Sequence, residues 1–196
     1  MVERNISSAD SVAAGYYDSS DADRFYEQVW GGEDIHIGLY ESPDEPIASA
    51  SERTVHSLLN LAKDLCEGGC VVDLGSGYGG ASRRLASWSD RPVEAINISA
   101  VENDRHRRLN LEAGLGDRIT VHDASFESVP LVDGCADLIW SQDAILHAGD
   151  RARVLHEVAR LLKPGGCFVF TDPMAADGVE MDLLQPILDR IHLPDL

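Results

Sequence analysis

The chain has 196 residues, enough for one well-packed domain, and its 44% apolar and 26% charged residues are typical of a globular protein. Its formal net charge of −18 repels nucleic acid and anionic membranes, so we expect neither as a partner. No apolar run is long enough to span a membrane, and the first residues lack the basic-then-apolar order of a signal peptide, which predicts a cytoplasmic protein.

The acidic residues are spread along the chain, and the sequence contains only two lysines. Such a composition suits the salt-rich cytoplasm of a halophile, where ions screen self-repulsion, although an ordinary acidic protein is an equally good interpretation. Of the four cysteines, Cys66 and Cys70 are four residues apart, a spacing that a metal site can use. Because Cys70, Cys135 and Cys167 adjoin apolar runs, we interpret the cysteines as buried free thiols and predict no metal site.

Residues 1–47 are predicted to form an N-terminal aromatic segment that covers the substrate site. A short helix capped by Ser20 or Asp21 is expected to end at Trp30. Tyr26 and Trp30 are four residues apart, so they either form the core face of this helix or reach the site. The aromatic residues of the segment are Tyr16, Tyr17, Phe25, Tyr26, Trp30 and Tyr40.

Residues 48–196 are predicted to form one domain in which strands alternate with helices. Short apolar runs predict strands at 71–74, 93–98, 119–122, 136–140 and 167–170. Helical patterns predict helices at 48–65, 79–88, 100–113, 151–162 and 181–191. Because parallel strands need such crossover connections, we expect an α/β Rossmann-like domain, with a mostly parallel sheet and helices on both faces.

A glycine-rich turn follows the first strand, in the order Asp73-Leu-Gly75-Ser76-Gly77-Tyr-Gly-Gly80. Glycines let a ligand approach the backbone, and the N-terminus of the next helix offers free N–H groups and the positive end of its dipole. Alone, this pattern is ambiguous, since Gly75, Gly77 and Gly80 also match the dinucleotide-binding order G-x-G-x-x-G.

Three features together favour a different ligand. Asp73, at the strand end, suits a cationic amino group better than a pyrophosphate. Asp123 closes the third strand, where its carboxylate can accept a hydrogen bond from an adenine amino group. The order L-L-K-P-G-G at 161–166 precedes the fifth strand. Over residues 70–172, these motifs resemble class I S-adenosylmethionine (SAM)-dependent methyltransferases.

This resemblance implies SAM as the cofactor and S-adenosyl-L-homocysteine as its product. The class usually ends the second strand in an acidic residue that holds both ribose hydroxyls, whereas this chain has Asn97 there. The amide can still accept and donate hydrogen bonds, although Asn97 can also be a plain turn residue. The resemblance assigns cofactor binding to Asp73, Gly75, Ser76, Gly77, Asn97, Ile98, Asn103, Asp123, Ala124, Ser125, Ser141, Tyr26 and Trp30.

Members of this class also end with two further strands, the last one antiparallel, and none is visible after Pro194. We therefore expect a C-terminally incomplete methyltransferase domain that lacks the last two strands. The fifth strand then keeps an open edge, at which copies of the chain can associate.

Two segments, 16–38 and 140–147, narrow the resemblance to small-amine N-methyltransferases, and within these to the sarcosine/dimethylglycine N-methyltransferases of glycine betaine biosynthesis, an osmoprotection pathway. The order S-x-D-A-I-L-H at 141–147 is also found in phosphoethanolamine methyltransferases, so another small amine is an alternative substrate. A SAM-binding module without catalysis is a third interpretation.

Methyl transfer is an in-line displacement, so the enzyme mainly positions an unprotonated amine against the methyl carbon. His147 or Asp143 can accept the amine proton, and aromatic faces and carboxylates can stabilise the positive charge that develops on nitrogen. We assign His147, Asp143 and Tyr17 to catalysis, and Tyr16, Tyr17, Gln142 and Asp143 to substrate binding. Each has a plainer alternative in the core or on the surface.

The remaining charged residues receive structural interpretations. Arg105, His106, Arg107 and Arg108 are predicted to form a solvated helix face. The carboxylate of a glycine-derived substrate calls for an arginine or several N–H donors, and the sequence does not identify that arginine. Arg24 lies in the N-terminal segment, but an exposed position is an equally good interpretation of it. No role is assigned to His36, His56, His122, His156 or His192.

Overall fold

The computed structural model describes residues 15, 17–18, 30, 33–63, 69–89, 91–191 and 193. The predicted helix before Trp30, with its cap at Ser20 or Asp21, lies outside the described residues, and so do Tyr16 and Tyr26.

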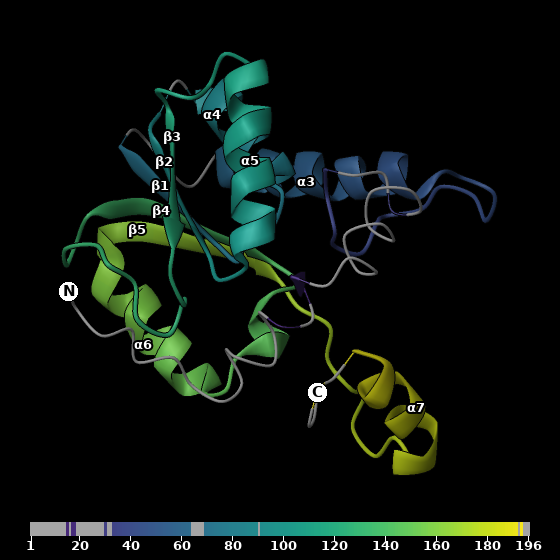
Figure 1. Cartoon of the computed structure of the whole chain (residues 1–196). Helices are drawn as coiled ribbons and strands as arrows, with labels where there is room; N and C mark the ends of the chain where they lie inside the picture. Colours follow the sequence, from purple (N-terminus) through teal and green to yellow (C-terminus); the bar gives the residue numbers. More distant parts are fainter. Residues whose placement is uncertain are drawn as a thin grey trace.

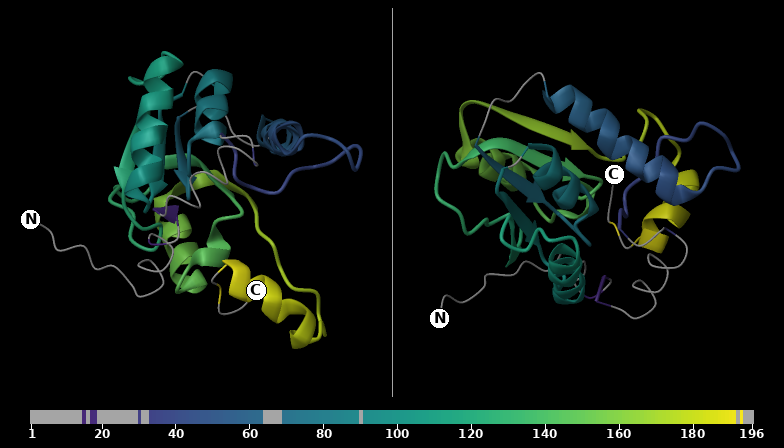
Figure 2. Two further views of the ribbon diagram at one scale, coloured as in Figure 1. Left: turned by 45° about the vertical axis from the view of Figure 1, so that its right-hand side comes forward. Right: turned by 90° about the horizontal axis from the view of Figure 1, so that it is seen from above.

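Five parallel strands form one sheet in the order β3-β2-β1-β4-β5, and helices pack on both of its faces (Figures 1 and 2). The predicted α/β Rossmann-like class is therefore confirmed. The strand order reverses between β1 and β4, which is the place where open α/β sheets bind their ligands. The strands are β1 (Cys70–Leu74), β2 (Val93–Asn97), β3 (Ile119–Asp123), β4 (Ala136–Gln142) and β5 (Leu162–Thr171).

The two faces of the sheet carry separate apolar clusters. α3 and α4 bury their apolar sides against one face, which includes Val71 and Trp140, whereas α6 covers the other face at Val72 and Ile139. Consecutive residues such as Val71 and Val72 serve opposite faces because side chains alternate along a strand. The helices are α3 (Ile47–Lys63), α4 (Gly80–Ser89), α5 (Ala100–Glu112), α6 (Arg151–Leu161) and α7 (Met181–Ile191), with a 3-10 turn, η2 (Ile145–His147).

The structure corrects the predicted start of the last strand. The L-K-P-G-G segment, predicted as a turn, is the first half of β5, which begins at Leu162 rather than at Cys167. Leu162 pairs with Ala136, and the register shifts before Cys167 pairs with Leu138. Gly165, at φ 84°, gives the left-handed backbone that this irregularity needs.

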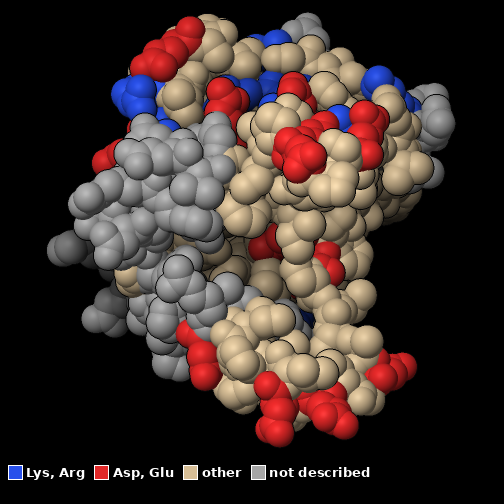
Figure 3. Space-filling model, turned by 90° about the vertical axis from the view of Figure 1, so that its right-hand side faces the viewer, with Lys and Arg blue, Asp and Glu red and all other residues tan. Residues whose placement is uncertain are grey.

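The charged surface and the cysteines can be compared with what the composition predicted. On the face drawn in Figure 3, acidic and basic side chains mingle in the upper half, and acidic side chains gather along the lower rim. Cys70, Cys135 and Cys167 are free thiols, as expected, although they are partly rather than fully buried. None of the described helices combines the length and the apolar character needed to cross a membrane.

Substitution Leu138→Ala tests the packing of the central strands. Leu138 is fully buried in β4, so the change should lower the free energy of unfolding by about 2–5 kcal/mol. The matched control Leu155→Ala, at a residue of α6 that is 51% exposed, should change it by less than about 0.5 kcal/mol. Urea unfolding of the two variants measures both values, and equal losses would contradict this assignment of the core.

Candidate functional site

The glycine-rich turn joins β1 to α4 and is anchored to β2. The backbone is left-handed at Gly75, Gly77 and Gly79, with φ of 75°, 49° and 80°. The N–H groups of Gly75 and Ser76 donate to the carbonyl oxygen of Ile96 at 2.8 and 3.2 Å. The turn predicted to bind a ligand therefore has a backbone shape that favours glycine at three positions.

A buried imidazole supports this turn. His106, from α5, is fully buried, and its Nδ1 lies 3.5 Å from the Ser76 hydroxyl. A Cβ atom added at Gly79 would lie 2.0 Å from His106 Nε2, so the imidazole fills the space that glycine leaves. Burial, together with the positive charges of Arg83 and Arg107, lowers the pKa of His106 to about 3 and keeps the ring neutral.

The predicted solvated face at residues 105–108 is therefore wrong at His106, which is buried. Arg105 and Arg107 are only partly exposed. The guanidinium of Arg105 lies 4.6 Å from the centre of the Tyr78 ring, and Arg107 is held in ion pairs. The physical reason is that this side of α5 packs on the polar glycine turn, so polar side chains can be buried there with partners.

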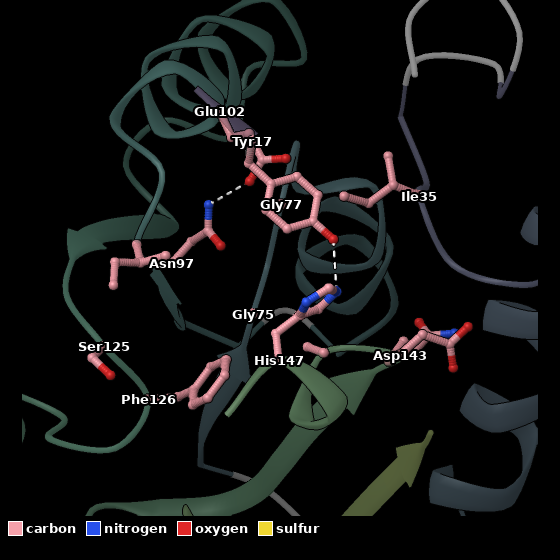
Figure 4. Close-up of a pocket in the computed structure, with 13 residues that line it drawn as sticks. Tyr17, Ile35, Gly75, Gly77, Asn97, Glu102, Ser125, Phe126, Asp143 and His147 are labelled. Carbon is pink, nitrogen blue, oxygen red and sulfur yellow. Dashed lines mark hydrogen bonds between the residues drawn. The ribbon is translucent and has the colours of Figure 1, made fainter. Parts of the chain in front are cut away.

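Two adjoining hollows open at the carboxyl ends of β1, β2 and β4. The larger hollow has about 600 Å³ of space when its open mouth is included, and Figure 4 shows the residues that line it. Its walls contain the predicted residues Tyr17, Gly75, Gly77, Asn97, Ile98, Ser125, Gln142, Asp143 and His147. They also contain four residues that the sequence reasoning missed, Ile35, Glu102, Phe126 and Ala144. The smaller hollow encloses about 320 Å³ and contains the predicted Asp73 and Ser76.

The smaller hollow is acidic. Asp73 is 2% exposed and accepts a hydrogen bond from the Ser82 hydroxyl at 2.5 Å, and burial, with the nearby charge of Asp34, raises its pKa to about 6. Asp34 is also buried, and pairs with Arg84 at 2.8 Å and with His36 at 3.8 Å. Two carboxyl groups thus line the smaller hollow, and Asp73, which accepts its hydrogen bond from a serine rather than from an arginine or lysine, favours a cation there.

Residues 33–37 lie across the glycine turn. The Gly80 N–H donates to the carbonyl oxygen of Glu33 at 3.2 Å, and the Ile37 N–H donates to the Asp143 carboxylate at 2.6 Å. Asp143 itself has φ 48°, a left-handed conformation that costs a non-glycine residue about 1–3 kcal/mol and clusters at functional sites. The segment thus connects the turn to the end of β4.

Trp30 and Ser51 anchor this segment at His36. The indole N–H of Trp30 donates to the His36 carbonyl oxygen at 3.1 Å, and the Ser51 hydroxyl donates to the same oxygen at 3.0 Å. Trp30, predicted to contact the cofactor, is absent from the lining residues of both hollows. His36, which was assigned no role from the sequence, is 5% exposed and lines the smaller hollow.

A carboxylate lies beside Asn97 although the second strand does not end in one. The Asn97 side-chain amide donates to Glu102 Oε2 at 2.9 Å, and both residues line the larger hollow (Figure 4). Glu102 is 2% exposed and stands in the first turn of α5. An acidic residue in the first helical turn after β2 is the sequence signal that could have revealed it.

Besides Trp30, four further predicted cofactor residues are absent from the lining of both hollows. Asp123 accepts from the Asn103 amide at 2.7 Å and from the Arg107 guanidinium at 2.8 Å, so its carboxylate oxygens have partners in the protein. The Ser141 hydroxyl donates to the carbonyl oxygen of Leu74 at 3.0 Å. These four residues are Asn103, Asp123, Ala124 and Ser141.

Tyr17 and His147 meet on one wall of the larger hollow (Figure 4). The Tyr17 hydroxyl lies 2.9 Å from His147 Nε2, and the rings pack edge to face with centres 5.4 Å apart. Burial lowers the pKa of His147 to about 4, so the imidazole is neutral at physiological pH. The Leu146 N–H donates to Asp172 at 3.2 Å, which holds η2 and thereby His147 at the end of β5.

Within residues 33–63, 69–89 and 91–191, and the few described residues outside them, no three His, Cys, Asp or Glu side chains come together as a metal site.

The sequence belongs to a known family. A family model described as a methyltransferase domain matches residues 72–170, which include the glycine turn and the strands around it. The chain therefore belongs to the methyltransferase-domain family.

Individual relatives narrow this assignment. The chain is 81% identical to a dimethylglycine N-methyltransferase of Parasynechococcus marenigrum (strain WH8102), over 100% of this chain and 70% of the relative. It is 52% identical to a sarcosine/dimethylglycine N-methyltransferase of Halorhodospira halochloris, over 98% and 69% of the two chains. A crystal structure from Galdieria sulphuraria, described as a "putative sarcosine dimethylglycine methyltransferase", superposes with a TM-score of 0.81 and 47% identity, over 90% and 68%.

The substitution Gly79→Ala tests the support of the glycine turn. Gly178→Ala is the matched control, because Gly178 has a similar φ of 76° but, among the described residues, no atom within 4 Å of an added Cβ. The control should lose about 1–2 kcal/mol from backbone strain alone. Gly79→Ala should lose about 1–3 kcal/mol more, because its methyl group displaces the buried His106. Urea unfolding measures both losses, and similar values would show that the imidazole does not constrain the turn.

Proposed function

We propose that this chain is a SAM-dependent N-methyltransferase that methylates sarcosine, dimethylglycine or both toward glycine betaine. The N-methyltransferase relatives support the reaction and the substrate class. The observation that supports the proposal is the Tyr17–His147 pair on the wall of the larger hollow, where a neutral imidazole contacts a tyrosine hydroxyl beside space that suits SAM.

The two hollows fit the two ends of SAM. In the smaller hollow, the Asp73 carboxylate suits the cationic amino group of the methionine end. In the larger hollow, Asn97 and Glu102 suit the ribose hydroxyls, and Ile98 and Phe126 offer apolar surface to the adenine ring. When bound, SAM supplies a methyl group activated by its sulfonium.

The protein's own groups prepare the amine. A His147 with a pKa of about 4 stores a proton poorly, so the Tyr17–His147 pair favours an amine that reaches the site unprotonated. His147 orients the Tyr17 hydroxyl toward the hollow, and Tyr17, Gln142 and Asp143 position the amine. As the nitrogen becomes positive, the Asp143 carboxylate and the Tyr17 ring stabilise it.

Residues 33–37 fit the role of a cover over the site, because they bind to the glycine turn and to Asp143. We place the enzyme in the cytoplasm, since the described cysteines are free thiols, as is usual in a reducing compartment. Association of copies along the edge of β5 stays a prediction, as does the absence of nucleic acid from its partners.

The affinity for SAM should depend on the Asp73 carboxylate. Because the pKa of Asp73 is raised to about 6, the group loses its charge as the pH falls through 6, and SAM should bind about tenfold more weakly at pH 5 than at pH 7. The variant Asp73→Asn should bind weakly at both values. Asp172→Asn is the control, since the pKa of Asp172 is also about 6 but the residue lines neither hollow. Calorimetric titration across this range checks the prediction, and an unchanged affinity in Asp73→Asn would refute it.

A turnover assay with labelled SAM tests the proposed function. Sarcosine and dimethylglycine should accept the methyl group, and phosphoethanolamine should not. The variant Tyr17→Phe should lower kcat by at least about tenfold and leave SAM binding intact, because it removes only the hydroxyl group. Tyr40→Phe, at a residue that is 49% exposed, is the matched control. Transfer to phosphoethanolamine alone would contradict the substrate class, and no transfer by a chain that binds SAM would favour a non-catalytic module.

A further inference from the structure

Asp18 contacts the N-terminus of α5. The Ser99 hydroxyl donates to Asp18 Oδ1 at 2.7 Å, and the Val101 N–H points at the same oxygen at 3.4 Å. Ser99 is fully buried and caps α5, because its hydroxyl oxygen also accepts from the Glu102 N–H at 3.2 Å. An exposed carboxylate therefore joins a buried cap, at a helix end where negative charge is favoured.

The residue before Asp18 contacts a different wall of the larger hollow. Tyr17 reaches His147 of η2, whereas Asp18 reaches the start of α5. Tyr17 and His147 are 130 positions apart in the sequence, and Asp18 and Ser99 are 81 positions apart. Two consecutive residues thus bridge the hollow, and the anchor on α5 lies next to Asn97 and Glu102, which line it.

We propose that Asp18 is a positioning residue, which holds Tyr17 against His147 by fixing the chain to the start of α5. The inference rests on the proposed function only in giving the Tyr17–His147 pair its role in methyl transfer. The contacts of Tyr17 and Asp18 themselves need no bound ligand. Tyr17 has helical backbone and its hydroxyl contacts His147, and the charge-assisted contact of the next residue ties the same stretch of backbone to α5.

The pKa of His147 reports this positioning without SAM or amine. Burial is the cause of the low pKa of about 4, and the Tyr17 ring packs on the imidazole. Asp143 lines the same hollow and Asp172 accepts from the N–H group of Leu146, and neither residue is substituted in any variant compared for the pKa of His147. NMR titration of the imidazole therefore measures whether the Tyr17 ring still covers it.

The variant Asp18→Ala should raise the pKa of His147 from about 4 toward 6.5, because the uncovered ring is hydrated. Asp18→Asn should leave the pKa near 4, since its amide oxygen can accept both hydrogen bonds. Asp104→Ala is the matched control. It removes the same charge from an exposed position on α5 and should have no effect.

A double-variant comparison separates positioning from a general loss of structure. Tyr17→Leu gives the pKa of His147 without the aromatic cover and its hydrogen bond. If Asp18 acts through Tyr17, Asp18→Ala raises the pKa no further in the Tyr17→Leu background. An unchanged pKa in Asp18→Ala would overturn the proposal, and so would a full additional rise in the double variant or an equal rise in Asp104→Ala. Because the titration uses no cofactor and no substrate, failure here leaves the proposed function standing.

Discussion

The glycine-rich turn between β1 and α4 keeps its shape because the neutral imidazole of His106 fills the space beside Gly79. The turn is also hydrogen-bonded to the backbone of Ile96 in β2, so both β2 and α5 hold it in place. Both hollows include residues of this turn, and the segment at 33–37 binds to its end at Gly80. A displaced turn would therefore change both hollows and the segment at 33–37 together.

Carboxyl groups line both hollows. Asp73 lines the smaller hollow, and Glu102 and Asp143 line the larger one. SAM is a sulfonium with an amino group, and the product of methylating a tertiary amine is a quaternary cation, so acidic walls suit both. These few carboxyl groups act locally on a bound ligand. The net charge of −18 acts over the whole surface, where it affects solubility and repels anionic partners.

The strands and helices were largely predictable because their apolar periodicity is clear, and the predicted α7 has the bounds found in the structure. Periodicity failed where polar residues are buried. α5 hides His106 and Glu102 because it faces the glycine turn and the hollow rather than an apolar layer. Sequence spacing also could not show that Asp123 is held by Asn103 and Arg107, since those contacts depend on how β3 and α5 meet.

The motif residues were more predictable than their partners. The turn after β1 and the segment after β4 lie at the carboxyl ends of neighbouring strands, which parallel topology brings together. Tyr17 reaches His147 across 130 residues of sequence, and the resemblance to small-amine N-methyltransferases, rather than any local pattern, pointed to both. The start of β5 was missed because Pro164 and Gly165 read as a turn, whereas the register shift beside Ala136 accommodates them in the strand.

We expect SAM and a small amine to bind this site in adjoining positions. Calorimetric titration of the chain with SAM and with S-adenosyl-L-homocysteine, each repeated in the presence of dimethylglycine, measures this arrangement. Both ligands should bind, and S-adenosyl-L-homocysteine should bind more tightly when dimethylglycine is present. Binding of neither ligand, or cofactor binding that dimethylglycine leaves unchanged at every concentration, would contradict this arrangement.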